Sequence, residues 1–152
     1  MLINRENNFT YVLKYDCKDL SDMFYGCSSL TSINLCNFNN NNVTDMRYIF
    51  AYCSSLTSIN LFYFNTNNIV DIRYMSQRYS SLTSINLSNF NTRNVTTMYQ
   101  ILEVCKPLTS INLTNFNTNK VYDIGYMLSS CSSLISINLS IFNINMCCML
   151  DG

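Results

Sequence analysis

The sequence contains no histidine, only three glycines and one proline, and few charged residues. The lack of histidine excludes Ser-His and Cys-His catalytic pairs and histidine-ligated metals within this chain. The glycines, at positions 26, 125 and 152, do not form the Gly-rich loop that cradles a phosphate. The net charge is +0, so the basic excess that neutralises nucleic-acid phosphates is missing. We therefore expect no enzyme, no cofactor, no metal ion and no nucleic-acid partner.

Long hydrophobic runs are also missing from the sequence. No segment approaches the roughly 20 apolar residues of a membrane-spanning helix. Arg5, Glu6, Asn7 and Asn8 interrupt the start of the chain, where a signal peptide would carry its apolar region. The sequence alone therefore predicts either a cytoplasmic chain or a piece of a longer exported protein whose beginning is missing.

What the sequence does contain is a repeat. The string CSSLTSINL begins at Cys27 and again at Cys53, and close variants begin at Tyr79, Cys105 and Cys131. The spacing is 26 residues throughout, with no insertion or deletion. Such constant spacing implies that every copy makes the same structural turn.

Part of each repeat has the pattern of a strand. Ile85 and Leu87 alternate with Ser84 and Asn86, and an alternation of period two is typical of strands. The same apolar positions recur in every repeat, followed by a phenylalanine and then by a valine or isoleucine. We expect these columns to form one core: Ile33, Ile59, Ile85, Ile111 and Ile137; Leu35, Leu61, Leu87, Leu113 and Leu139; Phe38, Phe64, Phe90, Phe116 and Phe142; Val43, Ile69, Val95 and Val121.

The other part of each repeat has the pattern of a short helix. Met46, Ile49, Phe50 and Cys53 are spaced i, i+3, i+4, i+7, which places them on one helical face. Asp45 precedes them as a candidate N-cap. The same pattern predicts a helix of a partial first repeat at residues 19–26. A row of carboxylates for Ca²⁺ is the alternative use of the capping column, but Thr97 interrupts it and we favour capping: Asp45, Asp71, Asp123.

Together these elements make one coil of a solenoid, which can bury its apolar face only against neighbouring coils. We predict an α/β repeat fold: a leucine-rich-repeat solenoid with a parallel sheet on the concave side and short helices on the convex side. Residues 1–16 form an N-terminal extension. Residues 17–152 form a single solenoid domain with a partial first repeat, four full 26-residue repeats and a truncated last one. Phe90 lies mid-stack and should be buried.

The repeat unit NVTDMRYIFAYCSSLTSINL, residues 42–61, resembles the repeat of BspA-like leucine-rich-repeat surface proteins. More specifically, it is similar to the mycoplasma-type surface-lipoprotein repeat of unknown function, over about residues 17–146. The resemblance implies a surface-exposed or secreted solenoid, with adhesion as the use in some members and no catalytic or metal residues. Surface location rests on the family, since we find no signal peptide, lipobox cysteine or wall anchor. Tyr79 and Ser76 depart from the repeat, replacing a cysteine and an apolar residue.

Four of the eight cysteines share one column, at positions 27, 53, 105 and 131. Neighbours in a column would lie near the Cα separation of a disulfide, about 4.4–6.8 Å, so that Cys27–Cys53 and Cys105–Cys131 could pair in an exported protein. The alternative, which we favour, is a stack of buried free thiols acting as small apolar residues. CxxC pairs are absent, which argues against zinc.

Candidate binding residues lie on the exposed face of the predicted sheet. One column is asparagine in every repeat: Asn34, Asn60, Asn86, Asn112 and Asn138. This asparagine row is either a peptide- or glycan-binding row or an amide ladder in which each side chain bonds the next coil, and its invariance favours the ladder. Recognition is expected where columns vary. Phe62 replaces a cysteine or small polar residue and Tyr63 follows it, so the two form the best contact patch, unless one covers a gap between coils.

We therefore expect a non-catalytic surface or secreted module for interaction and adhesion, whose partner is a protein, such as a host or matrix protein, or a glycan. The alternatives are an intracellular protein-binding scaffold and a truncated fragment of a larger surface protein without independent function. Segment 141–150 is too apolar to cap the stack, so end-to-end self-association is expected unless another segment covers it. Tyr48, Tyr74 and Tyr126 are interpreted as solvent-facing decoration.

Overall fold

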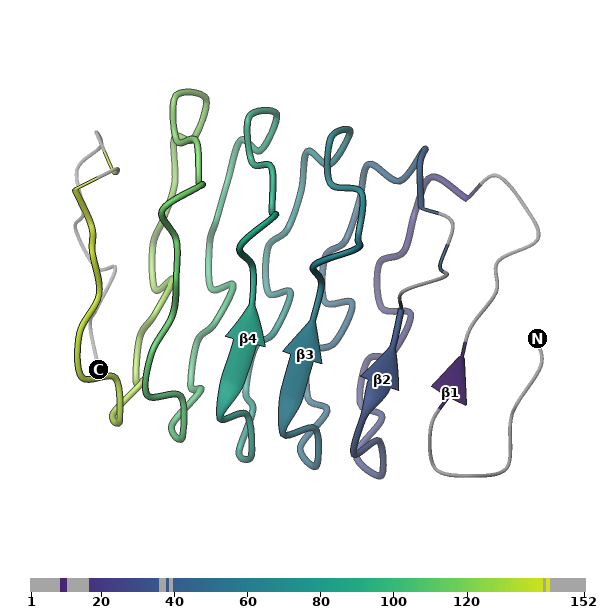
Figure 1. Ribbon diagram of the computed structural model, residues 1–152, viewed down its shortest axis with the longest axis vertical. Coiled ribbons are helices and arrows are strands. Elements are labelled where there is room, and N and C mark those ends of the chain that lie inside the picture. The colour runs from purple at the N-terminus through teal and green to yellow at the C-terminus, as the bar shows by residue number, and fades with distance from the viewer. Residues whose placement is uncertain (1–8, 11–16, 36–37, 39, 141, 143–152) are drawn as a thin grey trace.

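The computed structural model describes residues 9–10, 17–35, 38, 40–140 and 142, and its successive repeats stack as coils (Figure 1). One short strand from each of the first coils lies on the same side of the stack: β1 (Phe9–Thr10), β2 (Ile33–Asn34), β3 (Ser58–Asn60) and β4 (Ser84–Asn86). β1 pairs with β2, and β3 pairs with β4, both in parallel. Within the residues that the structure describes, regular secondary structure is thus limited to a small parallel sheet.

The register of this sheet equals the length of the repeat. Ser58, Ile59 and Asn60 lie opposite Ser84, Ile85 and Asn86, an offset of 26 residues. A parallel bridge between Ser110 and Ser136 carries the same alignment into later coils. The prediction that SINL segments lie side by side in parallel is therefore confirmed for these coils. β1 comes from the segment predicted as an N-terminal extension, and it pairs with an offset of 24.

The predicted apolar columns form the core. Ile59, Leu87 and Phe90 are at most 2% exposed, and the phenylalanines pack ring on ring between coils. The ring centroids of Phe38 and Phe64 lie 5.6 Å apart. Four members of the strand columns are only partly buried: Ile33, Ile111, Ile137 and Leu139.

The predicted short helices are wrong, because the described residues contain no helix. Residues 46–53 form consecutive tight turns, in which Tyr48 and Tyr52 have positive φ angles of 54° and 62°. Such left-handed residues cannot occur within a right-handed helix. The buried positions were nevertheless predicted correctly, since Met46, Ile49, Phe50 and Cys53 are all fully buried.

Hydrogen bonds between coils explain why the turns replace a helix. The N–H groups of Tyr48, Phe50 and Tyr52 donate to carbonyls of the next coil over 3.0–3.1 Å. The N–H groups of Ile49 and Ala51 donate instead to the carbonyls three residues earlier. Successive N–H groups thus alternate between a hydrogen bond within their own turn and one to the next coil. Backbone hydrogen bonds therefore join the coils on the turn side of the stack as they do on the strand side.

A buried polar column, not predicted from the sequence, also joins the coils. It consists of Asn40, Thr66, Thr92 and Thr118. The Thr92 hydroxyl accepts a hydrogen bond from the Asn117 N–H at 2.7 Å and donates to the Asn117 carbonyl at 3.0 Å. Thr66 accepts from the Asn91 N–H in the same way. A buried hydroxyl is stable here because it satisfies backbone groups of the neighbouring coil.

Candidate binding surface

The asparagine row is exposed in every coil, as predicted, but its four members from Asn60 onward do not form an amide ladder. The side-chain oxygens of Asn60, Asn86, Asn112 and Asn138 accept hydrogen bonds from the backbone N–H two residues later, over 3.0–3.1 Å. The side-chain oxygen bonds within its own coil, and not to the next coil, because the backbone N–H two residues later is already within reach. The row therefore stabilises each coil separately.

Hydrogen bonds between asparagine side chains of neighbouring coils occur at Asn65 and Asn91, and each joins two different columns. The Asn65 side-chain amide donates to the Asn41 side chain at 2.9 Å, and the Asn91 amide donates to Asn67 at 2.7 Å. The oxygens of both side chains accept backbone N–H groups two residues later. The amide bonds between coils therefore lie outside the asparagine row.

Phe62 and Tyr63 are both exposed, by 40% and 68%. Their rings meet edge to face, with centroids 5.1 Å apart. In later coils the position of Phe62 holds a hydroxyl that bonds the asparagine row, as Ser88 does with Asn86 at 2.7 Å. The position of Tyr63 holds an asparagine, and Asn89 there bonds the preceding coil. In the coil of Phe62, two polar side chains that serve the fold are thus replaced by two exposed rings.

An open groove of about 420 Å³ lies beside Tyr63. This Tyr63 groove is lined by Ile33, Asn34, Leu35, Asn60 and Tyr63. It brings together three residues of the predicted surface, and Phe62 packs against one of them. Asn86, Asn112 and Asn138 do not line it.

The structure also shows an aromatic surface that the sequence interpretation missed. Five tyrosines on the turn segments contact one another from coil to coil and form what we call the tyrosine ladder: Tyr25, Tyr48, Tyr74, Tyr99 and Tyr126. Their centroids lie 4.4–6.2 Å apart, and Tyr48 and Tyr74 are almost parallel. Tyr48, Tyr74 and Tyr126 share one column of the 26-residue repeat, and this was the sequence feature that could have revealed the surface. Tyr25 and Tyr99 lie outside that column, so the sequence did not show that the five rings form a continuous row.

A second open groove, of about 440 Å³, lies beside the first three tyrosines of the ladder. It is lined by Asp22, Tyr25, Tyr48, Tyr52, Tyr74 and Gln77. Burial and then the neighbouring Tyr74 and Asp22 raise the pKa of the Tyr48 phenol. The groove therefore combines aromatic rings with phenol hydroxyls, one carboxylate and the amide of Gln77.

Comparison with known proteins gives one match, which covers most of the chain. Residues 18–142 match the family described as "Mycoplasma protein of unknown function, DUF285". The chain belongs to this family. No curated protein and no solved structure matches it significantly. Family membership thus agrees with the mycoplasma-type part of the resemblance.

The cysteine column of this DUF285 protein consists of free thiols. Cys53, Cys105 and Cys131 are buried, and each donates to a backbone carbonyl 29 residues earlier, over 2.9–3.2 Å. Burial raises the pKa of Cys53 to about 11. The interpretation as buried free thiols is confirmed for these three, whereas Cys27 is exposed. Neither proposed disulfide is present.

The carboxylate column of the DUF285 chain caps turns. Asp45 accepts the Arg47 N–H at 2.9 Å and pairs with the Arg47 guanidinium, and Asp123 accepts the Gly125 N–H at 2.9 Å. These carboxylates accept backbone N–H groups, but the prediction that they cap helices is wrong, because each lies at the start of a turn. Within the described residues, no cluster of three or more potential metal ligands occurs, and no helix is long and apolar enough to cross a membrane.

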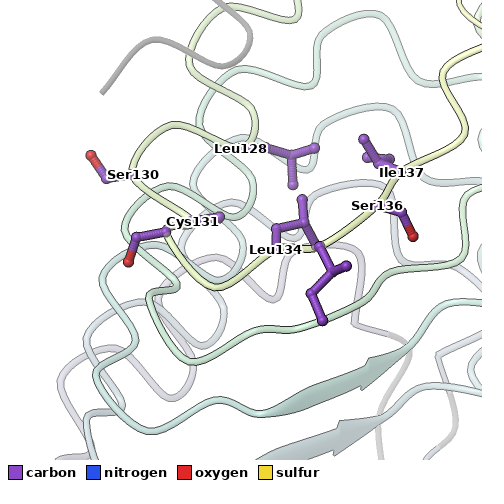
Figure 2. A pocket seen from close by; sticks show the side chains of 8 residues that line it. Leu128, Ser130, Cys131, Leu134, Ser136 and Ile137 are labelled. Carbon is purple, nitrogen blue, oxygen red and sulfur yellow. The ribbon is translucent and has the colours of Figure 1, made fainter.

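The C-terminal end of the described stack has an apolar hollow of about 290 Å³ (Figure 2). Leu128, Leu134 and Ile137 line it beside Cys131. Residues 141–150, the segment predicted to leave this end uncapped, lie outside the described residues except for Phe142. End-to-end association remains a prediction.

Proposed function

We propose that this DUF285 chain is a non-catalytic binding module that engages a protein partner through the Tyr63 groove. The observation that carries the proposal is the exposed pair Phe62 and Tyr63. Both positions hold polar residues with structural bonds in the next two coils. Aromatic rings in water contribute nothing comparable to the fold, but they dominate the energetics of protein interfaces.

The groove also has the polar groups that specificity requires. The Asn60 side-chain oxygen is held by the Phe62 N–H at 3.0 Å, which fixes the orientation of its amide toward solvent. Ile33 and Leu35 supply an apolar base. A partner residue that covers Tyr63 would therefore meet an apolar surface bordered by oriented amides, which is the usual composition of an interface centre and its rim.

We further propose that the stack is a solenoid of the leucine-rich-repeat kind, similar to BspA-like surface proteins, and that its use is adhesion to host or matrix proteins at the cell surface or after secretion. Parallel strands at the repeat spacing and buried leucine columns support the solenoid. Membership of a mycoplasma family supports the comparison with surface proteins.

The double variant Phe62→Ser/Tyr63→Asn tests the proposal. It installs the residues found at the same positions of the next coil, Ser88 and Asn89, so it should fold at least as well as the parent. Against a panel of immobilised extracellular-matrix proteins, we expect at least one parent interaction and at least tenfold weaker binding by the variant, equivalent to about 1.4 kcal/mol. Tyr122→Asn removes another exposed ring, outside the groove, and serves as the control. Equal binding by parent and double variant, or no binding by the parent, would contradict the proposal.

A second candidate is an intracellular protein-binding scaffold, and the free thiols favour it. Reduced cysteines persist in a cytosol, where disulfides are rare. Protease treatment of intact cells separates the two candidates. Removal of the chain by external protease supports the surface role, and full protection with lysis-dependent cleavage supports the intracellular one.

A further inference from the structure

The pairing of the strands is interrupted at the Tyr63 groove. β2 pairs with β1, and β3 pairs with β4, but β2 and β3 do not pair with each other. The Leu61 N–H donates to the Asn86 carbonyl of the next coil, whereas the Leu35 N–H, one coil earlier, does not bond the Asn60 carbonyl. Residues of both coils line the groove. The groove therefore lies over a seam between β2 and β3.

In the next two coils, the position of Tyr63 holds an asparagine that joins neighbouring coils. Asn89 and Asn115 each donate the side-chain amide to a backbone carbonyl 27 residues earlier. Asn115 thereby joins the coil of β4 to the following coil, whose strand segment β4 does not pair with either. Tyr63 has no amide to donate, so the fold lacks this bond at a seam where the strand pairing is also missing. An exposed ring at this place indicates a demand other than folding.

The polar groups of the groove are uncharged, and one of them presents a fixed donor. None of the lining residues carries a charge. The Asn60 side-chain oxygen already accepts the Phe62 N–H at 3.0 Å, so the side-chain NH₂ group remains for a ligand. A matching ligand is uncharged and rich in acceptors. It also has few N–H groups of its own, because each one buried without a partner would weaken binding.

The apolar part of the groove suits a compact aliphatic ring. Tyr63 is 68% exposed, and within the described residues Phe62 is its one ring contact. The planes of the two rings lie 83° apart, so the rings form a corner. Ile33 and Leu35 add aliphatic surface to the groove. Grooves that combine aromatic rings with hydrogen-bond donors are typical binding sites of proline-rich segments.

We propose that the Tyr63 groove binds a neutral, proline-rich segment of the partner in the polyproline II conformation. The inference rests on the proposed function and names the chemistry that the partner presents. Proline has no N–H to leave unpaired, and the polyproline II backbone exposes its carbonyls. A pyrrolidine ring packs on Tyr63, and a carbonyl of the segment accepts the Asn60 side-chain amide. Because this conformation exists before binding, the segment loses little entropy.

Titration with a ten-residue oligoproline peptide tests the proposal, by calorimetry and by NMR of the side-chain amides. We expect a dissociation constant of about 1 mM or tighter, with a shift of the Asn60 amide signals. A glycine-serine peptide of the same length should bind at least tenfold more weakly. Phe62→Ser/Tyr63→Asn should weaken oligoproline binding at least tenfold.

A single substitution tests the donor. Asn60→Asp keeps an oxygen that accepts the Phe62 N–H but replaces the amide donor by a carboxylate, so it should weaken oligoproline binding at least fivefold. Asn86→Asp makes the same change one coil later, outside the groove, and should bind like the parent.

The outcomes separate this inference from the proposed function. A parent that binds matrix proteins through Phe62 and Tyr63 but does not bind oligoproline overturns the inference alone. A parent that binds neither overturns both. Equal binding of the two peptides, or oligoproline binding that Asn60→Asp and Phe62→Ser/Tyr63→Asn leave unchanged, also overturns the inference.

Discussion

At the scale of single residues, the third repeat contains two substitutions that compensate for each other in side-chain volume. Tyr79 stands in the cysteine column and is fully buried, and Ser76, also fully buried, stands where Phe50 does one coil earlier. The larger side chain at one position fills space that the smaller one leaves at the other. The hydroxyls of Ser76 and Tyr79 are buried without a hydrogen-bond partner. The third repeat therefore keeps a packed core despite its two departures from the repeat.

A double-mutant cycle tests this compensation. Tyr79→Cys alone leaves a cavity and should cost roughly 2–4 kcal/mol, and Ser76→Phe alone overpacks the core at roughly 1–3 kcal/mol. The double variant restores the pair found at Phe50 and Cys53 and should lie near the parent in denaturant unfolding. Additive losses would show that the two positions do not share space.

Phe90 offers a simpler residue-scale test of the core. It is 1% exposed, and its ring centroid lies 6.1 Å from that of Phe116. Phe90→Ala should lower the free energy of unfolding by about 3–5 kcal/mol. Thermal melting measures the effect, and a melting temperature equal to that of the parent contradicts the burial of this ring.

The buried thiols make the stability depend on alkaline pH. Burial raises the pKa of Cys53 from 9.0 to about 11, and it also raises the pKa of Tyr79. Above pH 9.0 the unfolded chain loses the Cys53 proton while the folded chain keeps it, so the stability is complete below that pH and is lost as pH rises toward 11. Urea midpoints should fall between about pH 8 and about pH 10.5, and less steeply in Cys53→Ala. A midpoint that is constant or rises would contradict this.

At the scale of elements, the sequence predicted which residues are buried better than it predicted their conformation. The i, i+3, i+4, i+7 spacing that indicated a helix is produced here by turns of similar period, in which Met46 and Ile49 still point inward. The left-handed backbone at Tyr48 and Tyr52 is what excludes a helix. Tyrosine does not favour this conformation, so the sequence could not predict it. Strands were predictable because an alternation of period two has few alternative explanations.

A substitution at one left-handed turn position tests this conformation. Val104 has a φ of 60°, where a β-branched residue is strained. Val104→Asn should therefore stabilise the chain by about 1 kcal/mol, whereas Val70→Asn, at an exposed valine outside these positions, should not. A loss of stability at Val104 comparable to that expected within a helix would restore the helical interpretation.

At the scale of the whole molecule, the repeat length was sufficient to predict the stacking of the coils but not the surfaces that they form. A fixed spacing of 26 residues predicts the stacking, because each column must meet itself in the next coil, as Ile59 meets Ile85. The Tyr63 groove was predictable in part, since Phe62 and Tyr63 break their columns. The tyrosine ladder was not, because Tyr25 and Tyr99 join it through space and not through register.

Engineered cysteine pairs measure the stacking most directly. Ser58 and Ser84 lie opposite each other in β3 and β4, at a separation of about 4.8 Å that a disulfide can span. In a Cys27→Ser background, Ser58→Cys/Ser84→Cys should cross-link within one chain under mild oxidation, as peptide mapping would show. Ser58→Cys/Ser110→Cys, two coils apart, should not. Cross-linking of the second pair but not the first would contradict parallel coils in 26-residue register.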